Sequence, residues 1–396
     1  MRIESIRLRN YKAFRDVHLT DLPGFLVVVG ANGTGKTTLF DVFGFLHDSL
    51  TGTVRQALDK RGRFREVISR GAMEGETILI ELQYRMEITG TNRLVTYSLE
   101  IAEEDGQPVV RRETLRYKRG RHGKPFHFLD FSNGQGYAVT NEEDFQREDE
   151  ELTREEQRVA SDSLAIKGLG QLERFKAANA FRALMESWHV SDFHISAARG
   201  RKEVVGNQEH LTPTGDNLPL VARYLFEHHP ERFAAILRTM TERVPGVASV
   251  EPRLTEDGYL TLRFQDGSFK TPFLDRYVSD GTIKMFAYLV LLNDPAPHPL
   301  LCVEEPENQL YPKLMVELAE EFRAYSDRGG QVMVSTHSPD FLNAVELEEV
   351  CWLVKRDGCT QVRRARDDAQ LAACVAEGDQ LGYLWKQGLF DGVDPA

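Results

Sequence analysis

A glycine-rich loop at residues 30–37 constrains the fold of this chain more than any other feature. Its sequence, Gly-Ala-Asn-Gly-Thr-Gly-Lys-Thr, fills every fixed position of the phosphate-binding pattern G-x-x-x-x-G-K-[ST]. The apolar run at 25–29 predicts a strand before the loop, and the apolar spacing over 38–50 predicts a helix after it. This order is typical of a loop whose backbone N–H groups surround phosphate oxygens.

The loop side chains predict how a nucleoside triphosphate would be bound. Lys36 would reach the β- and γ-phosphates, and the hydroxyl of Thr37 would take one position on Mg²⁺. The helix that follows adds its dipole to the attraction for anions. The predicted nucleotide-binding residues are Asn32, Gly33, Thr34, Gly35, Lys36, Thr37 and Thr38.

A second motif is a short apolar segment at 300–303 that ends in two adjacent acids, Glu304 and Glu305. Successive residues of an extended strand point to different sides, so two acids can perform two tasks. We expect Glu304 to orient Mg²⁺ through its water shell, and Glu305 to polarise the attacking water as a general base. The alternative is a strand end that faces solvent.

A histidine follows another predicted strand, at 332–334, within the sequence Ser-Thr-His-Ser-Pro. At the phosphate edge of a sheet, such a histidine can hydrogen-bond a γ-phosphate and respond to its loss. His337 therefore joins Lys36 and Glu305 as a predicted catalytic residue, although a structural histidine is the common alternative. Four other histidines have no carboxylate or cysteine context in the sequence that suggests a metal site: His189, His194, His228 and His229.

Residues 277–282 place Ser279, Asp280 and Gly281 at the start of a helix predicted over 280–292. The start of a helix can bind an anion. The glycine loop already binds the nucleotide of its own subunit. A second γ-phosphate-binding site on the same chain is therefore expected to bind the nucleotide of a partner subunit. The alternative is an ordinary helix cap formed by Ser279 or Asp280.

The remaining pattern predicts an α/β fold with several parts. Alternating stretches between 77 and 117 predict an antiparallel meander, and the acid-rich run at 141–156 predicts a helix or a mobile, solvated insertion. Helices are predicted at 172–188, 218–226 and 231–244, with a hairpin at 247–264. Beyond 280, strands alternate with helices, which predicts a mainly parallel sheet.

Composition limits the classes of protein that fit. The net charge of −12 argues against a generally basic nucleic-acid surface, but local clusters at 111–112, 116–121 and 199–202 could bind DNA or simply form solvated loops. No apolar run approaches the roughly 20 residues that span a bilayer, and the first residues alternate like a strand instead of a signal peptide. Four cysteines without metal-ligand spacing indicate reduced thiols in a cytoplasmic protein: Cys302, Cys351, Cys359 and Cys374.

Together these motifs resemble those of the ABC-type ATPases of the SMC, RecF and OLD group, particularly its compact bacterial AAA family ATPases. The matching segments are the opening strand and turn at 6–14, Walker A at 30–37, a Ser-Asp-Gly signature at 278–282, Walker B with the catalytic glutamate at 300–305, the D-loop at 307–310 and the switch-histidine loop at 335–339. The resemblance implies an ABC-ATPase head, in which a P-loop parallel sheet carries an antiparallel β subdomain and a helical lobe.

The resemblance also implies a mechanism and a set of domains. Two heads would sandwich two ATP–Mg²⁺, with Ser279 and Gly281 of one head touching the γ-phosphate held by Lys36 of the other, and hydrolysis would open the dimer. The expected domains are 1–117 (N-terminal ATPase half), 118–170 (polar and acidic insertion), 171–280 (helical lobe ending in the signature) and 281–396 (C-terminal ATPase half).

The sequence also departs from the family pattern. Glu304 stands where Asp is commoner, and the signature lacks the Gly-Gly-Gln ending of transporters. The Q-loop glutamine stays open between Gln171 and Gln83. The long coiled coil of SMC proteins is missing, and residues 350–396 are too few for the C-terminal nuclease domain of OLD proteins.

Two functions follow as hypotheses. The first is an ATPase switch that acts on DNA, or with a separately encoded effector such as a nuclease, in DNA repair or in defence against phage. The second is a regulatory or scaffold protein that binds ATP with little hydrolysis and controls a partner nuclease or toxin. A transporter subunit at a membrane is disfavoured by the Ser-Asp-Gly signature and by the loop at 335–339.

Overall fold

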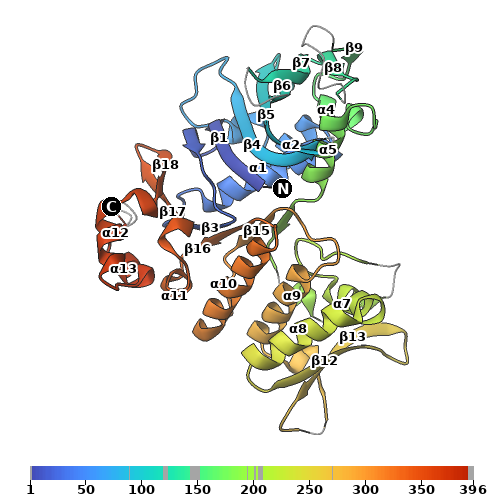
Figure 1. Cartoon of the computed structure of the whole chain (residues 1–396), viewed down its shortest axis with the longest axis vertical. Helices are drawn as coiled ribbons and strands as arrows, with labels where there is room; N and C mark the ends of the chain where they lie inside the picture. The colour runs from blue at the N-terminus through green and yellow to red at the C-terminus, as the bar shows by residue number, and fades with distance from the viewer. Residues whose placement is uncertain are drawn as a thin grey trace. The chain divides into compact units, whose positions relative to one another are not determined.

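The computed structural model describes residues 2–88, 90–118, 124–142, 152–193, 195–199, 202–203, 208–269 and 271–390. The chain forms two compact units (Figure 1). The first contains the residues up to 188 together with 351–367, and the second contains 189–350 and 368–390. Among the described residues, no helix has both the length and the apolar character needed to cross a membrane.

Some of the features predicted from sequence lie outside the described residues. They are the basic residues at 119–121 and 200–201, the acidic residues at 143–151, and His194.

An eight-stranded antiparallel sheet dominates the first unit, with strand order β2-β1-β4-β5-β6-β7-β8-β9. The strands are β1 (Arg2–Tyr11), β2 (Phe14–Leu19), β4 (Ile78–Ile88), β5 (Thr91–Glu104), β6 (Gln107–Tyr117), β7 (Phe126–Ser132), β8 (Gln135–Val139) and β9 (Arg154–Arg158). Alternate residues of β4, such as Ile80, Leu82 and Tyr84, are buried. The predicted antiparallel meander is therefore confirmed.

The sheet extends further than the sequence suggested. Residues 154–158, at the end of the acid-rich run, pair with β8 as a strand, so the prediction of a helix or a solvated insertion is wrong there. Arg154 explains part of the difference, because its guanidinium lies over the rings of Tyr137 and Phe126, at 5.0 and 5.5 Å. Cation–π contacts of this kind hold a polar strand against its neighbours.

Helices cover this sheet and flank the glycine loop. They are α1 (Lys36–Thr51), α2 (Val54–Asp59), α3 (Phe64–Val67), α4 (Ala165–Leu169) and α5 (Lys176–Glu186). On α5, the ring of Phe181 stacks on Tyr84 and tilts against Tyr97, with centroids 4.6 and 4.5 Å apart. The sequence pattern missed α2 because it is short, although Thr53 and Gln56 form a capping box at its start.

Three further strands of the first unit lie in the order β3-β17-β18: β3 (Phe25–Val29), β17 (Val350–Arg356) and β18 (Cys359–Arg364). All five residues of β3 are buried. Strand β17 pairs with β18 as an antiparallel hairpin.

The second unit contains three parallel strands: β10 (His189–Ser191), β15 (Leu301–Glu304) and β16 (Val332–Thr336). The strands β15 and β16 were predicted from the sequence, and β10 was not. Strand β15 pairs in parallel with β10 on one side and with β16 on the other. The helices α9 (Asp280–Leu292) and α10 (Pro312–Asp327) lead into β15 and β16. Helix α9 is buried on nearly all sides, as its continuous apolar sequence requires.

A helical lobe within the second unit packs around α9 (Figure 1). It contains α6 (Ile195–Ala198), α7 (Leu218–His228), α8 (Pro230–Arg243), β11 (Lys202–Glu203), β12 (Val247–Leu254), β13 (Tyr259–Asp266) and β14 (Phe273–Leu274). The predicted helices and hairpin of this region are confirmed. The unit is completed by α11 (Pro339–Leu342), α12 (Ala369–Ala376) and α13 (Leu381–Lys386).

Candidate active site

The glycine loop joins β3 to α1 in the first unit. Gly33 and Gly35 have φ angles of 80° and 102°, which favour glycine over residues with a Cβ. Gly30 is required for space, because a Cβ there would lie 2.5 Å from the hydroxyl oxygen of Thr34 and 3.0 Å from the carbonyl oxygen of Leu353. Each glycine of the pattern therefore has a local physical reason.

The side chain of Lys36 is buried and folds back over this loop. Its Nζ donates to the carbonyl oxygens of Gly30 at 2.7 Å and Ala31 at 3.4 Å. The hydroxyl of Thr34 donates to the Ala31 carbonyl at 2.8 Å, and the Thr34 carbonyl accepts from the hydroxyl of Thr360 at 2.7 Å. Thus the ammonium group is already positioned at the loop, whereas Asn32, Gly33 and Thr37 are exposed.

The two predicted acids lie at the end of β15 in the second unit. Glu304 is the last residue of the strand and is half-buried. Glu305 follows with φ of 42°, a left-handed conformation that is uncommon outside glycine. Its N–H donates to the Ser335 carbonyl at 2.9 Å, and its Oε2 accepts from the side-chain amide of Asn308 at 3.1 Å. The backbone thus turns sharply at the predicted general base, as strained active-site residues often do.

Glu307 connects these acids to the predicted switch histidine. Its Oε1 accepts from the hydroxyl of Thr336 at 2.7 Å and from the backbone N–H of His337 at 2.9 Å. The Nδ1 of His337 lies 3.4 Å from Oε1 of both Glu305 and Glu307. Glu307 is buried, whereas the His337 side chain is 50% exposed, so a charged partner in solution can still reach the imidazole.

Lys284 is a residue that the sequence reasoning missed. It lies on α9 with only 3% of its surface exposed, and its Nζ donates to the carbonyl oxygen of Asn308 at 2.9 Å and to that of Glu305 at 3.4 Å. Burial lowers the pKa of Lys284 to about 8, while Glu307 and other nearby carboxylates oppose this shift. A lysine within the apolar sequence of α9 was the available signal.

The signature residues cap α9. The Oγ of Ser279 accepts from the N–H of Thr282 at 3.2 Å and lies 2.7 Å from its hydroxyl. Asp280 pairs with Arg199. A Cβ on Gly281 would lie 2.9 Å from the carbonyl oxygen of Gln309, so this glycine lets the D-loop approach the helix. Ser279 therefore acts as a helix cap in this structure, whatever else it binds.

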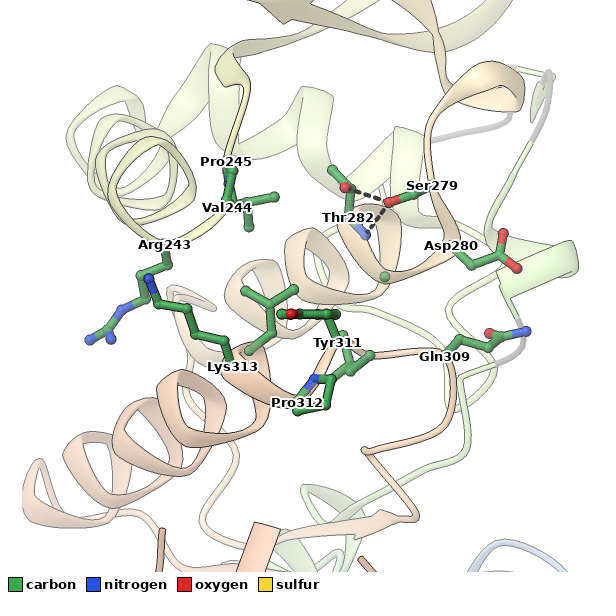
Figure 2. A pocket seen from close by; sticks show the side chains of 13 residues that line it. Arg243, Val244, Pro245, Ser279, Asp280, Thr282, Gln309, Tyr311, Pro312 and Lys313 are labelled. Atoms are coloured by element: carbon green, nitrogen blue, oxygen red, sulfur yellow. Dashed lines mark hydrogen bonds between the residues drawn. The ribbon is translucent and has the colours of Figure 1, made fainter. Parts of the chain in front are cut away.

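A pocket of about 780 Å³ opens beside the signature, entirely within the second unit. Figure 2 shows Ser279 and Thr282 on one side of it, with Arg243 and Lys313 on the other. Arg243 is neutralised by acids of α10: Glu317, Glu320 at 2.9 Å and Glu321 at 3.0 Å. Gln309 and Tyr311 of the D-loop also line the pocket.

The two Q-loop candidates lie in the first unit. Gln83 is half-buried in the middle of β4, paired with Ser5 on one side and Thr96 on the other. Gln171 is exposed in the turn after α4. The choice between them stays open.

Three arginines of the basic clusters at 111–112 and 116–121 are paired with carboxylates. Arg112 pairs with Asp130 and Arg116 with Glu81, each at 3.0 Å. Arg111 pairs with Glu104 at the same distance. Because these charges are compensated, this surface is a weaker candidate for DNA binding than the sequence alone suggested.

Comparison with known proteins identifies the family. Residues 25–343 match the family described as "AAA domain, putative AbiEii toxin, Type IV TA system". The chain belongs to this family. The matched range begins at β3 and includes the glycine loop, the signature, both acids and His337.

One relative and one solved structure extend the comparison. The relative is the DNA replication and repair protein RecF of Heliobacterium modesticaldum, 26% identical over 139 residues that cover 33% of this chain and 37% of that protein. The solved structure is an SMC head bound to the C-winged helix domain of ScpA. It is 15% identical, with a TM-score of 0.56, and the match covers 92% of this chain and 97% of that one. The resemblance to SMC and RecF proteins is confirmed, and the fold is that of an SMC-type ABC-ATPase head.

Proposed function

We propose that this protein is a cytoplasmic ATPase head that dimerises around two ATP–Mg²⁺ and switches a DNA-related process in repair or in defence against phage. Lys36 and the loop N–H groups bind the phosphates, and Thr37 and Glu304 hold Mg²⁺, directly or through its water shell. Glu305 polarises the attacking water. His337 contacts the γ-phosphate and responds to its loss.

One observation carries this proposal: Glu305, Glu307 and His337 come together at the ends of two adjacent parallel strands. Open α/β sheets bind their ligands at the carboxyl ends of the strands. Glu307 fixes the backbone at His337, while the carboxylate of Glu305 and the imidazole stay partly exposed. This arrangement suits an acid that works on a water molecule beside a transferred phosphoryl group.

The first test replaces the general base. We expect Glu305→Gln to bind ATP, to lose turnover and to accumulate as an ATP-bound dimer in light scattering. Glu256→Gln, in an exposed turn of the same unit, is the matched control and should behave as the wild type. A Glu305→Gln protein that hydrolyses ATP at the wild-type rate would remove Glu305 from the mechanism.

A second test asks whether Ser279 serves the partner's nucleotide. Lys36→Met and Ser279→Arg should each be inactive alone. In a mixed dimer, one site has an intact Lys36 from one head and an intact Ser279 from the other. Activity in the mixture above that of either variant supports the shared site, and a mixture as inactive as its components contradicts it.

The scaffold alternative rests on Glu304, which stands where aspartate is commoner. Under this hypothesis, the longer side chain of Glu304 changes the distance between its carboxylate and Mg²⁺ and so slows ATP turnover. Steady-state phosphate release separates the two functions: tight ATP binding with almost no release supports a scaffold that controls a separately encoded nuclease or toxin.

The names of the relatives support the proposed process. RecF is named a DNA replication and repair protein, and the family description refers to a toxin of a Type IV TA system. Phosphate release measured with and without DNA tests the first connection. Capture of partners by the ATP-bound Glu305→Gln protein tests the second.

A further inference from the structure

We propose that His210, Asp294 and His298 form a binding site for a divalent transition metal, for which Zn²⁺ is the best fit. The three residues come from two separate segments of the second unit. Asp294 and His298 lie in the loop between α9 and β15, and His210 follows β11. Since β15 runs from Leu301 to Glu304, this cluster lies at the opposite end of the strand from the catalytic acids.

The ligand atoms have suitable spacing. One donor atom of each residue lies within 4.8 Å of the other two. The Nδ1 of His210 is 2.8 Å, and the Nε2 of His298 is 4.0 Å, from the same Oδ2 of Asp294. Zn–N and Zn–O bonds of about 2.0–2.2 Å in a tetrahedral site place neighbouring ligand atoms roughly 3.4 Å apart. Small side-chain rotations therefore bring all three atoms onto one ion.

Asp294 gives the site its charge. It is 3% exposed, and its Oδ1 is fixed by the N–H of Ala296 at 2.9 Å, so Oδ2 is left to face the imidazoles. Arg232 donates to the backbone carbonyl of Asp294 at 3.2 Å, which holds the loop and leaves the carboxylate to the histidines. A buried carboxylate needs a compensating cation, and a metal bound through two neutral imidazoles supplies one.

His189 is an independent sign of a missing ligand. It begins β10, is 5% exposed, and its ring centroid lies 4.8 Å from that of His298. Its Nε2 is buried and has no hydrogen-bond partner among the described residues. A buried ring nitrogen without a partner is costly, and a bound metal or its water would satisfy it. Sequence alone did not suggest a metal site at His189, because His298 is more than a hundred residues further along the chain.

The donor set selects the metal. Imidazole nitrogens with one carboxylate suit Zn²⁺ and similar borderline ions, whereas Mg²⁺ and Ca²⁺ prefer sites made of oxygen. The His210 side chain is 47% exposed, which leaves a path for the ion. Tyr325 donates its hydroxyl to the His298 carbonyl at 2.6 Å and so orients this ligand from outside, as supporting residues do in metal sites.

The test uses the full chain, freed of metal with a chelator and kept without nucleotide. Zn²⁺ is titrated against a chromogenic chelator, and thermal unfolding is followed in parallel. We expect one tight Zn²⁺ per chain and a higher Tm with Zn²⁺ present. His210→Ala should weaken binding at least tenfold and abolish the Tm shift, since ligands and their supports contribute about 10- to 100-fold in affinity. His228→Ala removes an exposed histidine of the same unit and should change neither.

Two further measurements make the proposal easy to overturn. Asp294→Asn keeps the shape of the side chain and should lose Zn²⁺ binding; if that variant fails to fold, His210→Ala still decides. Co²⁺ in place of Zn²⁺ should give a tetrahedral spectrum without the charge-transfer band of a thiolate. Absence of stoichiometric binding, unchanged affinity in His210→Ala, or a thiolate band from the cysteines would each refute the site. None of these readouts depends on ATP hydrolysis.

Discussion

The glycine loop of the first unit and the acid–histidine group of the second are ordered by different kinds of contact. In the loop, Lys36 and Thr34 donate to carbonyls three to six residues away. In the acid–histidine group, Glu307 accepts from Thr336 and His337, about thirty residues away along the chain. A phosphate loop carries its own geometry, whereas the catalytic acids depend on two strands being placed side by side.

The loop also has long-range support. The hydroxyl of Thr360, on β18, donates to the Thr34 carbonyl at 2.7 Å across 326 residues of sequence. Leu353, on β17, limits the space at Gly30. The hairpin of β17 and β18 therefore braces a loop that is otherwise locally determined.

The largest expected effect is on ATP turnover, when the lysine of the glycine loop is replaced. Lys36→Met should reduce ATP turnover by roughly 10²–10³, because it removes the cation that stabilises phosphate charge. The methionine fills similar volume, so the Tm should change little. Lys355→Met, which alters an exposed lysine of the same unit, is the control. Full turnover in Lys36→Met would mean that the loop does not serve the hydrolysed phosphate.

The next largest effect is on stability, when the buried acid of the acid–histidine group is replaced. Glu307→Ala should destabilise the protein by about 3 to 5 kcal/mol, because it leaves the buried Thr336 hydroxyl and the part-buried His337 N–H without their acceptor. Glu305→Gln, at a more exposed carboxylate, should cost little stability. Urea unfolding of both variants measures the difference. Equal stability losses would show that Glu307 is not the structural member of the pair.

A pH measurement sharpens the role of Lys284. Burial lowers its pKa to about 8 from an ordinary value of 10.5. Between these values the unfolded chain binds the proton and the folded chain does not, so stability should rise with pH, by up to about 3 kcal/mol over the window. Below pH 8 Lys284 is protonated in both the folded and the unfolded chain, and the buried charge lowers the stability of the folded state. Lys284→Met should remove this rise, and an identical slope in the variant would contradict the assignment.

The smallest effect concerns the approach of the D-loop to the signature. Gly281→Ala places a Cβ 2.9 Å from the Gln309 carbonyl and should cost about 1 to 2 kcal/mol. Gly267→Ala has its nearest neighbour at 3.9 Å and serves as the control. Thermal unfolding distinguishes the two variants. An equal Tm for both would show that the D-loop can move away from the added Cβ without loss of stability.

Much of the fold was predictable because its elements have strong local signals. The continuous apolar run of α9 and the alternation in β4 predicted these elements close to their observed limits. The strand β9 was missed because its polar sequence becomes a strand only through pairing with β8 and the stacking of Arg154 on neighbouring rings. The short helices α2 and α3 were missed because each has too few turns for a periodic pattern.

The sequence by itself determined the glycine loop, the two acids at a strand end and the histidine after the next strand, because each motif depends on neighbouring residues. Only the tertiary structure decided that Glu307 fixes the backbone of His337 and that Lys284 lies buried beneath the D-loop. It also brought His210 beside Asp294, 84 residues further along the chain. Each of these contacts joins residues that are far apart in the sequence. Such contacts are set by how the segments pack in three dimensions and cannot be read from the spacing of residues along the chain.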